Sequence, residues 1–125
     1  MRVVDTSAWI EWLVDSPTAA LIKPELPPRR DWLTPTIIQL ELAKWLSREV
    51  GEDAANRAVA FSRHCRVAPL DTDTALLAAD LASAWKLSVA DAIIYATAQR
   101  EGADLLTCDS HFSGLPGVTY IAKHP

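Results

Sequence analysis

Short apolar segments and helix-length segments alternate along this chain, and this alternation restricts the fold more than any other feature. Apolar stretches lie at residues 2–4, 31–34, 67–70, 104–107 and 118–121. The first three are each followed by segments with helical periodicity. Strands that alternate with helices form βαβ units, which build a mainly parallel sheet with helices on its faces. The sequence therefore predicts the α/β class.

Local signals predict where the helices begin. Thr6 or Ser7 is expected to cap the first helix through its hydroxyl. Thr34 and Pro35 are expected to open a long helix, with Thr34 as the cap and Pro35 at the first helical position. Pro69 favours a sheet edge for its strand. The expected helices span residues 8–15, 18–23, 35–50, 52–64, 74–86 and 88–101.

Composition sets limits on the class of protein. The chain has 125 residues and is 50% hydrophobic, which suits one domain over residues 1–125 with a real core. No apolar run approaches the roughly 20 residues that a membrane span needs. A formal net charge of −4 argues against a protein that binds nucleic acid mainly through the electrostatic field of its whole surface. Cys65 and Cys108 are the only cysteines, and their spacing matches no metal-binding or disulfide pattern, so we expect neither a zinc site nor a disulfide. We therefore expect a cytoplasmic protein.

Two acidic residues follow predicted strands. Asp5 comes directly after the first strand, and Asp109 comes two residues after the strand that ends at Thr107. The carboxyl ends of parallel strands meet at one edge of an α/β sheet, where ligands bind. The alternative is that each Asp only stabilises its own turn, which is a common role.

Two further acidic residues lie in predicted helices that should be buried. Glu41 falls inside an apolar helical stripe, where a carboxylate needs a partner; the alternative is that it reaches solvent or pairs with Arg48. Asp91 is the only charge in the first turns of an apolar helix. It also fits a capping box with Ser88, and capping is compatible with metal binding.

The four acidic residues are more informative together than singly, because all four are expected at the same edge of the sheet. Carboxylates that share one sheet edge repel each other and lose solvation unless a counter-ion is present. Oxygen ligands without His or Cys suit Mg²⁺ or Mn²⁺, and not zinc. Such ions serve the hydrolysis of phosphodiester bonds. The expected site consists of Asp5, Glu41, Asp91 and Asp109, with hydroxyls from Thr6, Ser7 and Thr107 nearby.

The motifs occur in a recognisable order. Val-Val-Asp-Thr-Ser comes first, then Glu41-Leu-Ala, then Leu-Ser-Val-Ala-Asp91-Ala, then Leu-Thr-Cys-Asp109-Ser-His-Phe. Over essentially its whole length the chain resembles PIN-domain ribonucleases, and most of all the VapC-type toxins of toxin–antitoxin pairs. The resemblance implies an α/β/α sandwich around a mainly parallel sheet. It also implies a metal-dependent endoribonuclease that acts on tRNA, rRNA or mRNA.

The same resemblance implies partners and residue roles. It implies a homodimer and a small VapB-type antitoxin whose C-terminal segment covers the acidic site. Carried over by position, the metal-binding catalytic acids are Asp5, Glu41, Asp91 and Asp109, and the supporting hydroxyls are Thr6, Ser7 and Thr107.

Other features leave alternatives open. Trp9 and Trp12 are candidates for a partner groove, or are tolerated surface aromatics. Asp71 and Asp73 superficially match a Mg²⁺-dependent phosphatase, although acids at a helix start suit the helix dipole. A non-catalytic PIN-like binding domain is the third alternative. His111 is expected to have a surface or packing role.

Overall fold

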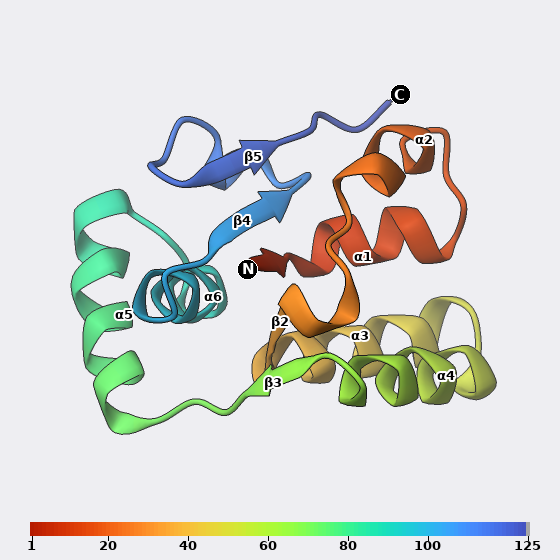
Figure 1. Cartoon of the computed structure of the whole chain (residues 1–125), viewed down its shortest axis with the longest axis horizontal. Coiled ribbons are helices and arrows are strands. Elements are labelled where there is room, and N and C mark those ends of the chain that lie inside the picture. The colour runs from red at the N-terminus through yellow and green to blue at the C-terminus, as the bar shows by residue number, and fades with distance from the viewer. Residues whose placement is uncertain (125) are drawn as a thin grey trace.

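The computed structural model describes residues 1–124 and contains a five-stranded sheet in the order β3-β2-β1-β4-β5 (Figure 1). Every neighbouring pair in this sheet is parallel, which confirms the predicted α/β class. The strand β3 lies at the sheet edge, as its nearby proline suggested. The strands are β1 (Arg2–Val4), β2 (Trp32–Pro35), β3 (Arg66–Ala68), β4 (Asp104–Thr107) and β5 (Val118–Tyr120).

Helices cover both sides of the sheet. Figure 1 shows α5 and α6 on one side, and α1 to α4 on the other. The most extensive contacts between helices are those of α3 with α4 and of α5 with α6. The helices are α1 (Thr6–Leu13), α2 (Ala19–Ile22), α3 (Thr36–Glu49), α4 (Glu52–Arg63), α5 (Thr72–Trp85) and α6 (Val89–Arg100), with short 3₁₀ turns η1 (Lys23–Glu25), η2 (Arg29–Asp31) and η3 (Ser110–Phe112).

The central strands β1 and β4 are apolar on both faces because helices cover both. Val3, Val4, Leu105 and Leu106 are all fully buried, as expected for the middle of a parallel sheet. Val4 pairs with Leu106 in the parallel register. The next residue on each strand therefore emerges at the same carboxyl edge, which positions the site described below.

The predicted start of the long helix is wrong by one residue. Thr34 and Pro35 belong to β2, where they pair with Val67 and Ala68 of β3. Sheet pairing outweighs the local capping signal, and Thr34 is completely buried. The helix α3 begins at Thr36, with Pro35 as the residue that precedes its first turn.

An aromatic cluster lies beneath α1. Trp9 is completely buried, and its ring centroid is 4.7 Å from that of Trp32 and 5.7 Å from that of Phe61. Trp12 belongs to the same cluster but is only partly buried. The expectation that Trp9 lines a partner groove is therefore wrong, because the helix presents Trp9 to the core.

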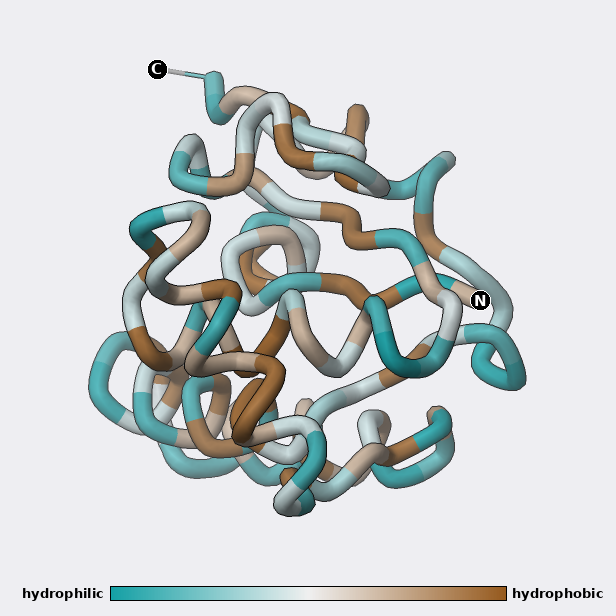
Figure 2. The backbone as a smooth tube through the Cα atoms, turned by 90° about the vertical axis from the view of Figure 1, so that its left-hand side faces the viewer, coloured by the Kyte–Doolittle hydropathy of each residue, from teal (hydrophilic) through white to brown (hydrophobic). Residues whose placement is uncertain are grey.

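Runs of hydrophobic residues along the chain are short and are separated by hydrophilic residues (Figure 2). Among residues 1–124, no helix is both long enough and apolar enough to cross a membrane.

Candidate metal site

Asp5 ends β1 at the carboxyl edge of the sheet and is 3% exposed. Its backbone N–H donates to the carbonyl of Leu106 at 2.8 Å, which extends the ladder between the central strands. Its carboxylate accepts hydrogen bonds from the hydroxyls of Ser7 at 2.6 Å and Thr107 at 2.9 Å. A buried carboxylate needs such donors, and together they fix its orientation.

The hydroxyls of Thr6 and Ser7 do not cap α1, contrary to the expectation. Asp5 is the residue before the helix, and its carbonyl accepts from the N–H groups of Ala8 at 2.9 Å and Trp9 at 3.0 Å. Ser7 also accepts from the N–H of Cys108 at 3.0 Å. The two hydroxyls are engaged by carboxylates because a carboxylate that loses solvent needs donors more than the helix end does.

Glu41 reaches the same region from α3. Thr6 donates a hydrogen bond to its carboxylate at 2.7 Å, linking the start of α1 to the middle of α3. The side chain is only partly buried, although Leu42 beside it is completely buried. Arg48 pairs with Glu49 at 2.8 Å. The alternative pairing of Glu41 with Arg48 is therefore not the one the structure contains.

Asp91 and Asp109 come from α6 and from the end of β4. Ser88 caps α6 by accepting from the N–H of Asp91 at 3.3 Å, as the capping signal predicted. The N–H of Asp109 donates to the hydroxyl of Thr107 at 2.9 Å. Thr107 therefore bonds the carboxylate of Asp5 and the backbone of Asp109 at once.

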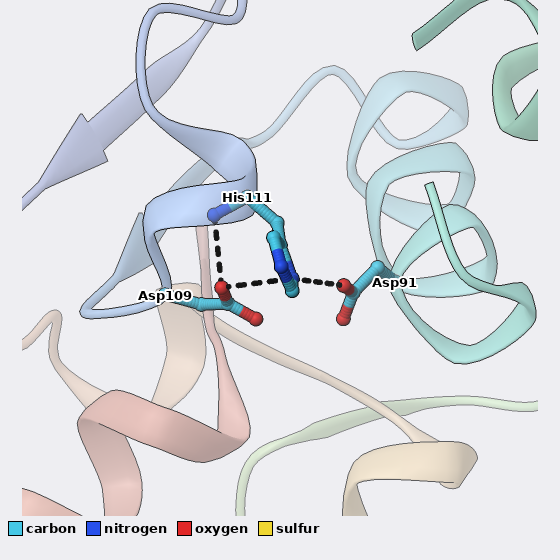
Figure 3. Close-up of side chains that lie close together, drawn as sticks. All are labelled: Asp91, Asp109 and His111. Atoms are coloured by element: carbon cyan, nitrogen blue, oxygen red, sulfur yellow. Dashed lines mark hydrogen bonds and ion pairs between the residues drawn. The ribbon is translucent and has the colours of Figure 1, made fainter. Parts of the chain in front are cut away.

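His111 lies between these two carboxylates (Figure 3). Its Nδ1 atom is 3.2 Å from the Asp109 carboxylate and 3.6 Å from that of Asp91. Asp91, Asp109 and His111 each offer one ligand atom, and these atoms lie within 4.8 Å of one another. The sequence predicted only a surface or packing role for His111, and it did not predict that His111 lies beside two acidic residues of the site. The signal in the sequence was its spacing of two residues from Asp109, across a turn.

The carboxylates affect each other's protonation. Burial raises the pKa of Asp5, hydrogen bonds from Ser7 and Thr107 oppose that rise, and the charges of Asp91 and Asp109 add to it. Burial also raises the pKa of Glu41, against the hydrogen bond from Thr6. Burial and the charge of Asp109 raise the pKa of Asp91. Neighbouring carboxylates therefore add to the effect of burial on the pKa of each of these three acids.

The donor set fits a hard divalent cation. Asp91, Asp109 and His111 form the group whose ligand atoms lie close together, and Asp5 is linked to Asp109 through the hydroxyl of Thr107. Asp5, Glu41 and Asp91 resist ionisation without a counter-charge. Oxygen donors of this kind are the ligands of Mg²⁺ and Mn²⁺. His111 adds a nitrogen donor at the solvent side, where its side chain is 75% exposed.

The acidic pair of the phosphatase alternative has a structural role. Asp71 caps α5 by accepting from the N–H of Thr74 at 2.8 Å, and Arg100 bonds its carboxylate at 2.9 Å. The bonds from Thr74 and Arg100 lower the pKa of Asp71 to about 2. Asp73 lies 3.8 Å from the same Arg100. Both acids already have partners, which favours the role of helix-start charges.

The family model described as "PIN domain" matches residues 2–118. The chain belongs to the PIN-domain family. A search of curated proteins finds no match to it. Solved structures similar to this PIN domain include a toxin–antitoxin complex from Klebsiella pneumoniae, with 25% identity, coverage of 95% of this chain and 96% of that chain, and a TM-score of 0.79.

Two further solved structures resemble this PIN domain. VapC20 of Mycobacterium tuberculosis, a sarcin-ricin loop cleaving toxin, is 22% identical over 100% of both chains, with a TM-score of 0.79. DNA-bound VapBC of Salmonella typhimurium is 20% identical over 97% of this chain and 96% of that chain, with a TM-score of 0.72. The fold thus matches VapC toxins of VapBC complexes and confirms the expected sandwich of helices around a parallel sheet.

Proposed function

We propose that this PIN domain is a metal-dependent endoribonuclease that acts as the toxin of a VapBC-type toxin–antitoxin pair. The observation that carries the proposal is the convergence of acidic side chains from separate elements: Asp91 and Asp109 offer ligand atoms within 4.8 Å of each other, and Thr107 links Asp5 to the backbone of Asp109. A purely structural role does not explain that convergence, because burial and mutual repulsion make it costly. The similarity to toxin structures supports the same conclusion. The acting unit is the single domain over residues 1–125.

The cation site would be formed by Asp5, Glu41, Asp91 and Asp109. One or two Mg²⁺ ions, or Mn²⁺ in their place, would supply water activation and charge neutralisation at the phosphodiester when bound. His111 lies close enough to Asp91 and Asp109 to join the ligands.

The hydroxyls have the task of positioning the carboxylates. Ser7 and Thr107 hold the Asp5 carboxylate by hydrogen bonds of 2.6 and 2.9 Å and so favour its ionised form. Thr6 holds Glu41 in the same way at 2.7 Å. Preorganised ligands do not have to be ordered when a cation and a substrate arrive, and this lowers the cost of binding them.

RNA is the proposed substrate, whether tRNA, rRNA or mRNA. With a net charge of −4, the protein gains little from its overall field and depends on local contacts to phosphates. Such contacts favour an exposed, single-stranded loop whose bases are splayed outward. The site is consistent with that substrate because its acidic edge is open to solvent at His111.

The proposed antitoxin groove lies between α1, α3 and α4. It has a volume of about 480 Å³ and is mainly apolar. Trp12 lines it, whereas Trp9 supports it from the core. An apolar face of an antitoxin helix would fit such a groove. The other lining residues are Leu13, Val14, Leu46, Val50, Ala54, Arg57, Ala58 and Phe61.

We also propose a cytoplasmic homodimer. Large apolar side chains remain exposed on the pair of helices α5 and α6, including Leu76 at 63% and Val89 at 76%. Exposed apolar residues of this size support self-association. The measurement that tests it is the molar mass in solution by sedimentation equilibrium.

Cleavage of defined RNAs tests the proposed function. A panel of purified tRNAs, rRNA fragments and mRNA is incubated with the protein in Mg²⁺ and, separately, in EDTA. The proposal expects specific cuts in Mg²⁺ alone. A protein that cuts nothing and is not stabilised by Mg²⁺ would be the non-catalytic binding domain instead.

A further inference from the structure

A polar hollow adjoins the acidic site on the side of β5. Its volume is about 550 Å³, and Ser7 and Asp109 form the wall that it shares with the acidic site. Tyr120 and Lys123 form part of the opposite wall. The strand β5 is the edge strand beside β4 (Figure 1). The hollow therefore lies directly beyond the carboxylates along the carboxyl edge of the sheet.

The side chains of this hollow are the types that bind a nucleotide. Tyr120 is 36% exposed, so part of its ring is free for stacking. Lys123 is exposed, and among residues 1–124 it takes part in no ion pair. Single-stranded nucleic acid is held by bases that stack on aromatic rings and by cations that contact phosphates. A cation beside an acidic cluster also offsets its repulsion of the RNA backbone.

The segment that carries Lys123 is fixed on both sides. Before it, the N–H of Ile121 donates to the carbonyl of Thr107 at 2.9 Å, which continues the ladder with β4. After it, the N–H of His124 donates to the hydroxyl of Thr18 at 2.8 Å, and Thr18 is completely buried. The backbone at Lys123 is therefore held against the body of the domain, so little ordering is needed when a ligand binds.

We infer that this hollow is the subsite for a nucleotide next to the scissile phosphate, with Tyr120 stacking its base and Lys123 contacting its phosphate. The inference rests on the proposed function, because it assumes RNA as the ligand. Neither residue takes part in the bond-breaking step. Both act in substrate binding, so their loss weakens binding and leaves the reacting groups intact.

The test is binding of a fluorescein-labelled, short single-stranded oligoribonucleotide of mixed sequence, followed by anisotropy in Ca²⁺. A gel verifies that the RNA stays intact. Tyr120→Ala is expected to raise the Kd about tenfold, the loss typical of one stacked base. Tyr120→Phe, which keeps the ring, should stay near wild type. Lys123→Gln should raise the Kd several-fold, and Lys123→Glu should raise it further.

Arg63→Gln is the charge-matched control. Arg63 ends α4 just before β3 begins, so it lies toward the amino edge of the sheet, away from the hollow. It is exposed, and its replacement removes the same charge as Lys123→Gln. The inference expects Arg63→Gln to bind RNA like wild type. Equal effects of Arg63→Gln and Lys123→Gln would overturn it, because only overall charge would then matter.

Failure of this inference differs from failure of the proposed function. If the wild-type protein cleaves RNA but Tyr120→Ala and Lys123→Gln leave both the Kd and KM unchanged, the subsite is wrong and the nuclease stands. If the variants bind RNA normally and lose only antitoxin affinity, the hollow belongs to a protein partner. If the wild type binds RNA through this hollow without cutting it, the subsite stands and the nuclease fails. With active enzyme, KM should rise while kcat is kept.

Discussion

The Thr107 hydroxyl donates a hydrogen bond of 2.9 Å to the buried Asp5 carboxylate, and both residues lie at the ends of the two central strands. The same hydroxyl accepts from the N–H of Asp109 at 2.9 Å. One side chain thus ties two acids of the site to the sheet. The geometry of the acidic edge depends on this contact as much as on the acids themselves.

Thr107→Val should destabilise the protein by about 1–3 kcal/mol, because it leaves a buried carboxylate with one donor fewer and a backbone N–H without its acceptor. Urea unfolding measures the change. Thr119→Val on β5 is the matched control, since its hydroxyl has only a marginal contact of 3.5 Å with Arg2. That control should change stability by no more than about 0.5 kcal/mol. If both variants lose the same free energy of unfolding, the hydrogen bonds of Thr107 do not contribute more to stability than the contact of Thr119.

The pH dependence of stability should have a definite sign. Burial and neighbouring carboxylates raise the pKa of Asp5, Glu41 and Asp91 in the folded protein. The folded state therefore holds protons more tightly than the unfolded state. In EDTA, the contribution of these groups is favourable below the ordinary carboxyl pKa of about 4. It is lost as the pH rises through the raised values.

Thermal unfolding across pH checks this sign. Asp91→Asn should flatten the fall in stability with rising pH, because it removes one of the repelling charges. Mg²⁺ should restore the stability of the wild type above that range, and restore less in Asp91→Asn. Asp71 has a lowered pKa, so its contribution to stability is lost as the pH falls and not as it rises. Because both proteins contain Asp71, the difference between variant and wild type reports on the acidic site alone. Parallel curves for the two proteins would be inconsistent with coupled carboxylates.

Trp9 and Trp12 should differ in what their loss affects. Trp9→Ala removes a completely buried ring and should cost about 3–5 kcal/mol of stability. Trp12→Ala should cost less and should weaken binding of the proposed VapB-type antitoxin, because Trp12 lines the apolar groove. Calorimetric titration of the antitoxin measures the affinity. Trp85→Ala, which removes a ring that is 44% exposed on α5, is the control and should bind normally. Equal antitoxin affinities for Trp12→Ala and Trp85→Ala would remove the groove from the proposal.

Strand ends were the most reliable part of the prediction from sequence. Asp5 and Asp109 were expected at one edge because a parallel sheet places its carboxyl ends together, and the register of Val4 with Leu106 produces that arrangement. Glu41 was proposed as a site residue because a charge in an apolar helical stripe needs a partner. Its partner, Thr6, lies 35 residues away and has no local signal.

The errors share one cause, which is competition from distant contacts. Thr6 and Ser7 have good capping chemistry, but the carboxylates of Glu41 and Asp5 engage their hydroxyls. Thr34 and Pro35 have good helix-start chemistry, but pairing with β3 keeps them in the sheet. The sequence named both Trp9 and Trp12 as groove candidates, but it did not show which of them faces the core. His111 was undervalued because its position depends on a turn and on α6 together.

The central claim is that the four acidic residues form one cation site that cleaves RNA, and Asp91→Asn tests it most directly. Cleavage of the best RNA from the panel is measured in Mg²⁺ beside Asp73→Asn, which removes an equal charge that is paired with Arg100 outside the site. The account predicts that Asp91→Asn keeps its fold, loses stabilisation by Mg²⁺ and cleaves at least about 100-fold more slowly, as for an essential group at the reaction centre. Asp73→Asn should match wild type. A folded Asp91→Asn protein that cuts RNA at the wild-type rate and the same Mg²⁺ concentration would contradict the account.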